Sequence, residues 1–127
     1  FKGSSAPKSI TTFDRHGDTA LLFEGFFDLL SYLTLQHEPT PTADTAVLNS
    51  VMNLPRALPF LARHATIHAF LDNDEAGRLT LERLRNALPD ATVIDRAESY
   101  RAHKDLNESL RSSAKVSRTP RRRGRKL

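Results

Sequence analysis

The sequence contains no cysteine, which excludes several classes of protein. Disulfide-stabilised folds, thiolate zinc sites and enzymes with a cysteine nucleophile all depend on that residue. The five histidines are scattered and lack the spacing of a metal-binding pair. Any metal site in this chain is therefore expected to use oxygen ligands.

Long hydrophobic runs and glycine-rich loops are also missing. No stretch approaches the roughly 20 apolar residues of a membrane helix, and the start does not resemble a secretory signal. No glycine loop of the kind that cradles nucleotide phosphates occurs. We expect a cytoplasmic protein without a membrane partner, and the start at Phe1 suggests part of a longer chain.

Positive charge is concentrated at the C-terminus. The formal net charge is +4, but six arginines and lysines fall within the last ten residues, which leaves residues 1–117 at −2. A basic stretch of this kind cannot bury an apolar core, so residues 113–127 are expected to form a disordered tail. Its Arg121, Arg122 and Arg123 would bind nucleic-acid phosphates without sequence preference. A solvated chain end without a ligand is the alternative.

Short apolar runs alternate with segments of helical periodicity. Strands are predicted at residues 19–23, 45–48, 66–71 and 91–94, and helices are predicted to begin near residues 26, 54, 77 and 105. This alternation predicts an α/β fold with a parallel sheet of about four strands and helices on both faces. We expect residues 1–18 to be a flanking segment and residues 19–112 to be the domain.

The helix that begins near residue 26 carries a dense apolar stripe. Such stripes usually pack against the rest of the protein. We therefore expect its apolar residues to belong to the core, namely Phe26, Phe27, Leu29, Leu30 and Leu33.

Acidic residues directly follow the first and third predicted strands. Glu24 and Asp28 come after one, and Asp72 and Asp74 come after the other. The carboxyl ends of parallel strands meet at one edge of a sheet, where sites lie. Carboxylates gathered there without basic partners repel one another unless a cation is bound. Mg²⁺, or Mn²⁺ in its place, would meet this need and could serve phosphoryl transfer.

The second acidic pair also has a structural interpretation. Asp72, Asn73 or Asp74 could cap the following helix, as strand-terminal Asp and Asn often do. A calcium-binding helix-loop-helix is not expected, because Ala76 and Arg83 stand where that loop needs oxygen ligands.

Two segments resemble the signatures of the Toprim family. The first, LLFEGFFD at residues 21–28, is an apolar strand that ends in Glu-Gly, with Asp four residues after the Glu. The second, FLDNDEAG at residues 70–77, is similar to the family's Asp-x-Asp-x-x-Gly strand end. The likeness covers roughly residues 19–110. The family includes bacterial primases, topoisomerases and nucleases, so the resemblance implies a Toprim fold and magnesium chemistry on nucleic acid.

The resemblance also implies roles for individual residues. Glu24 would be the general acid/base, and Asp72 and Asp74 would be magnesium ligands. Asp28 would support this site or hold a second ion. Gly77 completes the second signature, at a turn where glycine allows close backbone approach.

A further segment, HKDLNE at residues 103–108, is similar to the Lys-Asp segment of primase-like members. The likeness implies that Asp105 approaches the metal and that Lys104 faces phosphate. Asn107 stands where primases often carry another acid, which leaves the number of metal ions open.

Three further basic residues are candidate phosphate ligands. Lys2 and Lys8 lie in a segment that resembles the one before the Toprim core in primase-like proteins of bacterial mobile elements. Arg78 follows Asp74 closely enough to meet a phosphate at the acidic edge.

The resulting hypothesis is a magnesium-dependent nucleotidyl-transfer domain of a DNA primase-like protein that synthesises primers. Its expected partners are DNA, nucleoside triphosphates and other domains of the parent chain, with a helicase as a further candidate. Two alternatives remain open: a Toprim nuclease that cleaves DNA, and a noncatalytic module that binds nucleic acid.

Overall fold

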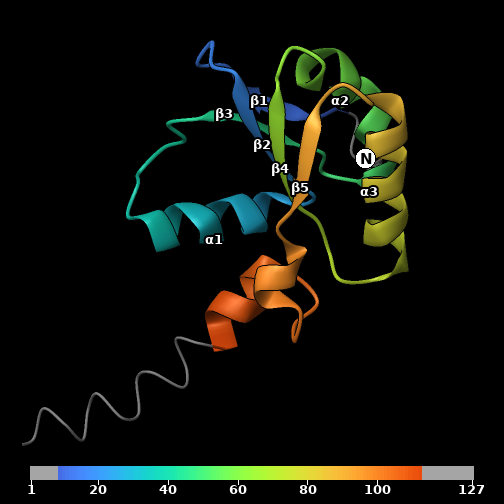
Figure 1. Ribbon diagram of the computed structural model, residues 1–127. Coiled ribbons are helices and arrows are strands. Elements are labelled where there is room, and N and C mark those ends of the chain that lie inside the picture. The colour runs from blue at the N-terminus through green and yellow to red at the C-terminus, as the bar shows by residue number, and fades with distance from the viewer. Residues whose placement is uncertain (1–8, 113–127) are drawn as a thin grey trace, which may run out of the picture.

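A five-stranded sheet forms the centre of the computed structural model, which describes residues 9–112 (Figure 1). The strands are β1 (Thr11–Phe13), β2 (Thr19–Phe23), β3 (Asp44–Val47), β4 (Thr66–Phe70) and β5 (Thr92–Asp95). Their order across the sheet is β1-β3-β2-β4-β5, and every neighbouring pair is parallel except β1 and β3. The predicted α/β class and its parallel strands are confirmed.

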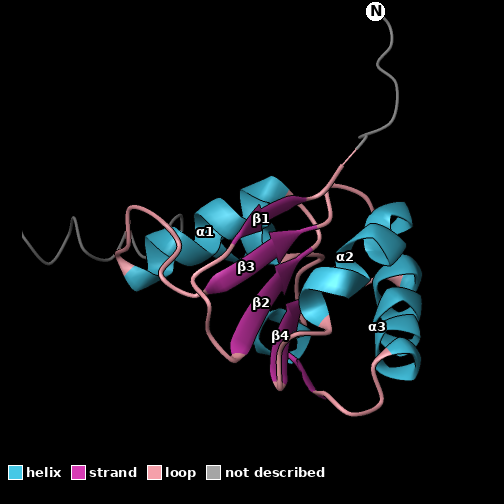
Figure 2. Cartoon of the chain, turned by 90° about the horizontal axis from the view of Figure 1, so that it is seen from above, coloured by secondary structure: helices cyan, strands magenta, loops and turns pink. Residues whose placement is uncertain are grey.

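Helices cover both faces of this sheet, as Figure 2 shows. The helices are α1 (Phe26–Gln36), α2 (Leu54–Leu61) and α3 (Glu75–Ala87), with 3₁₀ turns η1 (Val51–Asn53) and η2 (Ala97–Tyr100). Residues 106–112 are also helical. α1 lies on one face, whereas α2 and α3 lie on the other (Figures 1 and 2). Within residues 9–112, no helix is long and apolar enough to cross a membrane.

Strand β2 shows why the sequence forms a sheet that is buried on both faces. Ala20 and Leu22 belong to the core cluster under α2 and α3, whereas Leu21 and Phe23 belong to the cluster under α1. Successive side chains of a strand point to opposite faces. A continuous apolar run is therefore needed where both faces carry helices.

The sheet contains one strand more than predicted. β1 lies within the segment 1–18 and pairs antiparallel with β3, with Thr11 opposite Val47. It has only three residues with little apolar content. Its position depends on hydrogen bonding to a strand far along the chain, which local periodicity does not report.

Part of the apolar stripe of α1 does not enter the core, so that expectation was wrong for three residues. Leu29 and Leu33 are buried, whereas Phe26, Phe27 and Leu30 are 44%, 70% and 42% exposed. A helix that packs on a sheet turns only one face toward it. Phe26, Phe27 and Leu30 lie outside that face of α1.

Candidate metal centre

The two acidic motifs meet at the carboxyl edge of the sheet. β2 and β4 are adjacent and parallel, with Phe23 opposite Phe70, so the residues that follow them leave the sheet together. The main-chain N–H of Asp72 donates a hydrogen bond to Oε1 of Glu24, at 3.0 Å. The expected convergence of the two motifs is therefore present in the structure.

Three carboxylates form a compact group at this edge, which we call the acidic cluster: Asp28, Asp72 and Asp105. One oxygen of each lies within 4.8 Å of an oxygen of the other two. Asp28 is 5% exposed, and the other two are half-buried. Among the described residues, no salt bridge joins any of the three to a lysine, arginine or histidine.

An open cavity of about 320 Å³ gives access to the acidic cluster. Its walls also include Glu24, the exposed Phe27 and the polar residues Asn49 and Ser50. The sequence analysis did not single out Asn49 or Ser50. Their position just after β3, at the same edge of the sheet, could have indicated that they border the site.

Burial and mutual repulsion raise the pKa values of these acids. The pKa of Asp72 rises from 3.8 to about 7, through burial first and then the negative charges of Glu24, Asp28 and the other acids. Burial is also the main reason why the pKa of Asp28 rises from 3.8 to about 6. The pKa of Glu24 is raised by burial, although the Asp72 N–H opposes the change. Partly buried acids without basic partners provide the conditions in which a divalent cation binds.

Asp74 has a different position from the one expected of a metal ligand. Its Oδ1 accepts a hydrogen bond from the Gly77 N–H at 2.8 Å, so it is the N-cap of α3. It is not part of the acidic cluster, although its charge helps to raise the pKa of Glu24. The capping alternative is therefore realised at Asp74, and a ligand role for this residue remains a prediction.

Gly77 is required by the path of the chain at this edge. A Cβ at this position would lie 2.0 Å from the main-chain oxygen of Asp72. Any other residue would force α3 away from the end of β4. Gly77 thus sets the position of the Asp72 backbone.

Asp105 reaches the cluster from a segment outside the sheet. Its Oδ1 accepts from the Glu108 N–H at 2.8 Å, which caps the helical residues 106–112. The Asn107 N–H donates to Oδ1 of Asp28 at 3.1 Å. Asn107, which stands where primase-like members often carry another acid, thus contributes a main-chain N–H donor to the acidic cluster.

The predicted basic residues are less closely placed. Lys104 is exposed, and its charge lowers the pKa of Glu24 in opposition to burial. Arg78 is exposed on α3 and does not border the cavity. The remaining candidates and the predicted tail lie outside the described residues: Lys2, Lys8, Arg121, Arg122 and Arg123.

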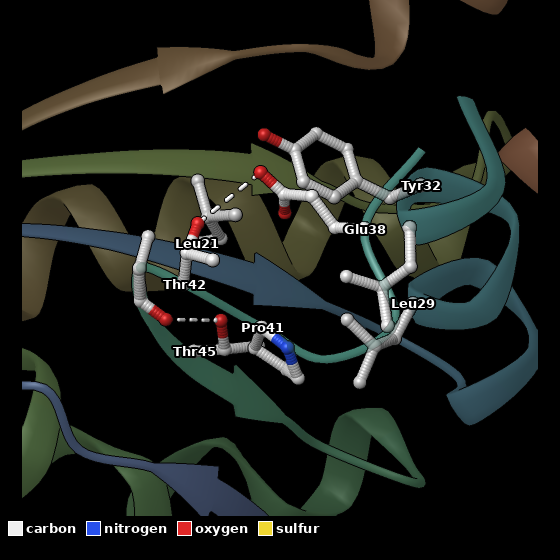
Figure 3. A pocket seen from close by; sticks show the side chains of 9 residues that line it. Leu21, Leu29, Tyr32, Glu38, Pro41, Thr42 and Thr45 are labelled. Atoms are coloured by element: carbon white, nitrogen blue, oxygen red, sulfur yellow. Dashed lines mark hydrogen bonds between the residues drawn. The ribbon is translucent and has the colours of Figure 1, made fainter. Parts of the chain in front are cut away.

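A second hollow, between α1 and the segment before β3, does not suit a substrate (Figure 3). Leu29 and Tyr32 line it on one side, and the Thr42 hydroxyl donates to Glu38 across its rim at 3.2 Å. Its volume of about 10 Å³ holds one water molecule at most. The cavity at the acidic cluster, where three carboxylates converge, is therefore a better candidate site than this hollow.

Comparisons with known proteins agree with this architecture. A family model described as Toprim-like matches residues 21–110. The structure is similar to that of the primase fragment of the bacteriophage T7 primase-helicase protein, with a TM-score of 0.60 and 21% sequence identity. The match covers 84% of this chain and 43% of that chain, so the present chain spans less than half of the T7 fragment. No curated protein matches.

Proposed function

The chain belongs to the Toprim-like family, and from this premise we propose that it is the magnesium-dependent nucleotidyl-transfer domain of a DNA primase-like protein. Its substrates would be DNA and nucleoside triphosphates. The observation that carries the proposal is the acidic cluster of Asp28, Asp72 and Asp105, whose oxygens lie within 4.8 Å of one another.

The donor set fits magnesium. Mg²⁺ prefers oxygen ligands and is usually held by one or two carboxylates, with water and substrate phosphates in the other positions. Asp28, Asp72 and Asp105 would hold the ion, and Mn²⁺ could replace it. When bound, the ion offsets the negative charge that develops on a transferring phosphoryl group.

Glu24 is suited to move a proton at this site. The Asp72 N–H holds one carboxylate oxygen in place, and burial raises the pKa of Glu24 above its ordinary value of 4.5. A general acid/base works best when its pKa is near the operating pH. Glu24 would accept the proton of the attacking hydroxyl or return one to the leaving group.

The wider surroundings suit nucleic acid, which is polyanionic. Exposed Lys104 lies close enough to affect the pKa of Glu24, and it would meet a substrate phosphate beside the ion. The arginines of the C-terminal tail would add nonspecific affinity that falls with rising salt. The other domains of the parent protein, including a helicase, would supply the remaining contacts.

The test uses the parent protein with a single-stranded template, labelled nucleoside triphosphates and Mg²⁺. New labelled primers are expected from the unchanged protein and from Asp90→Asn, a matched control at an exposed acid on another surface. Asp72→Asn should abolish them. If Asp72→Asn makes primers at the normal rate, the proposal is wrong.

A labelled DNA strand in the same reaction separates the alternatives. Shortened DNA without primers would indicate a nuclease that uses the same acids. DNA binding without any product, unaffected by Asp72→Asn or by removal of the divalent ion, would indicate a noncatalytic module.

A further inference from the structure

Asp105 belongs to the acidic cluster although it does not follow a strand directly. Nine residues separate it from the end of β5, and the chain between them passes through η2 and a turn. An irregular segment of this length needs fixed contacts if its last residue is to stay near a metal. Those contacts converge on one side chain, that of Asn73.

The side-chain NH₂ of Asn73 faces three main-chain oxygens of this segment, which share its two N–H bonds. Nδ2 lies 3.2 Å from the oxygen of Ala97, 3.0 Å from that of Tyr100 and 3.0 Å from that of His103. The main-chain N–H of Asn73 donates to the oxygen of Lys104. Asn73 therefore contacts four carbonyl groups between residues 97 and 104.

This arrangement requires an amide. Carbonyl oxygens only accept hydrogen bonds, so the group that faces them must donate, as the NH₂ of asparagine does. An ionised aspartate of the same shape has only acceptors and would repel all three oxygens. Capping does not explain the side chain, because the cap of α3 is Asp74.

A second hydrogen bond holds the 97–104 segment, and it is made at Leu71, on the other side of Asp72 in the chain. The hydroxyl of Tyr100 donates to the main-chain oxygen of Leu71 at 2.8 Å, and Tyr100 is 3% exposed. Leu71 and Asn73 thus hold the segment on either side of Asp72, and Lys104 immediately precedes Asp105.

We propose that Asn73 is a positioning residue that holds the 97–104 segment against the end of β4 and so brings the carboxylate of Asp105 to Asp28 and Asp72. This inference rests on the proposed metal site, because the consequence of the contact is a third ligand. Metal binding and the order of the segment are therefore coupled: a bound ion favours the held segment, and the held segment favours the ion.

The first test is a double-mutant cycle on the full chain, with Mn²⁺ affinity measured by isothermal titration calorimetry. Asn73→Ala and Asp105→Asn should each weaken Mn²⁺ binding, by on the order of tenfold or more for a residue that orients a ligand. If Asn73 acts through Asp105, the double variant binds no more weakly than Asp105→Asn alone. Asn86→Ala, at an exposed asparagine of α3, is the matched control and should bind normally.

Two results of the cycle would overturn the inference. One is normal Mn²⁺ affinity in a folded Asn73→Ala variant. The other is a full additional loss from Asn73→Ala in the Asp105→Asn background, since a general disturbance of the fold would act independently of Asp105. If Asn73→Ala does not fold, Tyr100→Phe removes one contact with little change of shape and should show the same coupling, more weakly.

A second test needs no metal and so separates this inference from the proposed function. Arg101 and Lys104 are exposed trypsin sites within the segment. Without divalent ions, mass spectrometry should show several-fold faster cleavage after them in Asn73→Ala than in the unchanged chain or Asn86→Ala. Equal rates would refute the positioning role. Failure of the unchanged chain to bind Mn²⁺ would instead refute the proposed function, whatever trypsin shows.

Discussion

Glu24 and Asp72 are joined directly, because the main-chain N–H of Asp72 donates to Oε1 of Glu24 at 3.0 Å. The two residues are 48 positions apart in the chain and meet because β2 and β4 are neighbours in the sheet. The bond orients the carboxylate proposed to move protons, and it fixes the main chain beside a proposed metal ligand. One contact therefore links the two proposed roles.

Glu24→Gln should separate proton transfer from metal binding. The Gln oxygen can still accept from the Asp72 N–H, so the local structure should remain. The side chain can no longer take a proton, and the rate of primer synthesis should fall by about 10²–10⁴. Mn²⁺ affinity should stay close to that of the unchanged protein. A variant with normal primer synthesis would contradict the role of Glu24.

The acidic cluster should make the metal-free protein less stable as pH rises. The pKa values of Asp28 and Asp72 are about 6 and about 7, above the ordinary value of 3.8. Between about pH 4 and pH 7 the folded chain therefore holds protons that the unfolded chain has released. Stability falls as pH rises through this window.

Thermal unfolding of the metal-free chain with and without Asp72→Asn checks this expectation. The variant lacks one of the repelling charges, so in EDTA at pH 8 it should unfold at a higher temperature than the unchanged chain, and at pH 5 the difference should shrink. Added Mg²⁺ at pH 8 should stabilise the unchanged chain and have little effect on the variant. A constant difference between the two chains across this pH range would contradict the prediction.

Asp74 can be tested as a cap and as a ligand with two substitutions. Asp74→Asn keeps an oxygen that can accept from the Gly77 N–H, whereas Asp74→Ala removes it. Loss of the cap should cost about 1 kcal/mol of unfolding free energy, so Asp74→Ala should be destabilised and Asp74→Asn much less so. Urea unfolding measures this difference. Normal Mn²⁺ affinity in Asp74→Asn would show that the residue is a cap and not a ligand.

The sequence was sufficient to predict those parts of the fold that depend on local patterns, such as β2 and β4. β2 is an apolar run buried on both faces, β4 is buried at Ile67, Ala69 and Phe70, and an acid follows each strand at its carboxyl end. Parallel pairing then brings Glu24 and Asp72 to one edge without further information. Spacing along the chain could therefore predict where the candidate site lies.

Spacing did not predict the composition of the acidic cluster: Asp105 was expected only from the resemblance, and Asp74 was expected as a ligand but lies outside the cluster. Asp74 and Asp105 are both acids beside a helix start, and only tertiary contacts decide which one faces Asp72. The contacts that bring Asp105 into place run from the side chain of Asn73 to main-chain oxygens, which the sequence does not encode as a pattern. The exposure of Phe27 was not predicted either, because it depends on which face of α1 lies against the sheet.

A buried histidine-aspartate pair at the opposite end of the sheet should support the fold but not the site. Nε2 of His64 lies 2.6 Å from Oδ2 of Asp44, and the side chains are 0% and 1% exposed. His64 Nδ1 lies 3.0 Å from the oxygen of Phe60, which can only accept. Nδ1 of His64 therefore donates to Phe60, and a proton lies between Nε2 and Oδ2 of Asp44, so each member of this buried pair depends on the other.

Asp44→Asn should destabilise the chain strongly, because it removes the carboxylate that pairs with the fully buried ring of His64. Removal of one partner of a buried pair typically costs about 3–5 kcal/mol. Asp14→Asn is the control, since Asp14 pairs with Arg63 at the surface and exposed pairs contribute little to stability. Urea unfolding at pH 7 compares the two variants, and similar losses in both would contradict the expected role of burial.

The same pair predicts a loss of stability in acid. Burial favours the protonated form of Asp44, but the His64 contact and the main-chain N–H groups of Arg15 and Gly17 hold its pKa below the ordinary value of 3.8. The unfolded chain therefore takes up this proton first as pH falls, so the contribution of Asp44 is complete above about pH 4 and is lost below it. Asp44→Asn should flatten the acid limb of the unfolding curve. At pH 7 the fraction that remains folded should bind Mn²⁺ normally, because the acidic cluster lies at the other edge of the sheet; a weakened affinity would show that the two edges are coupled.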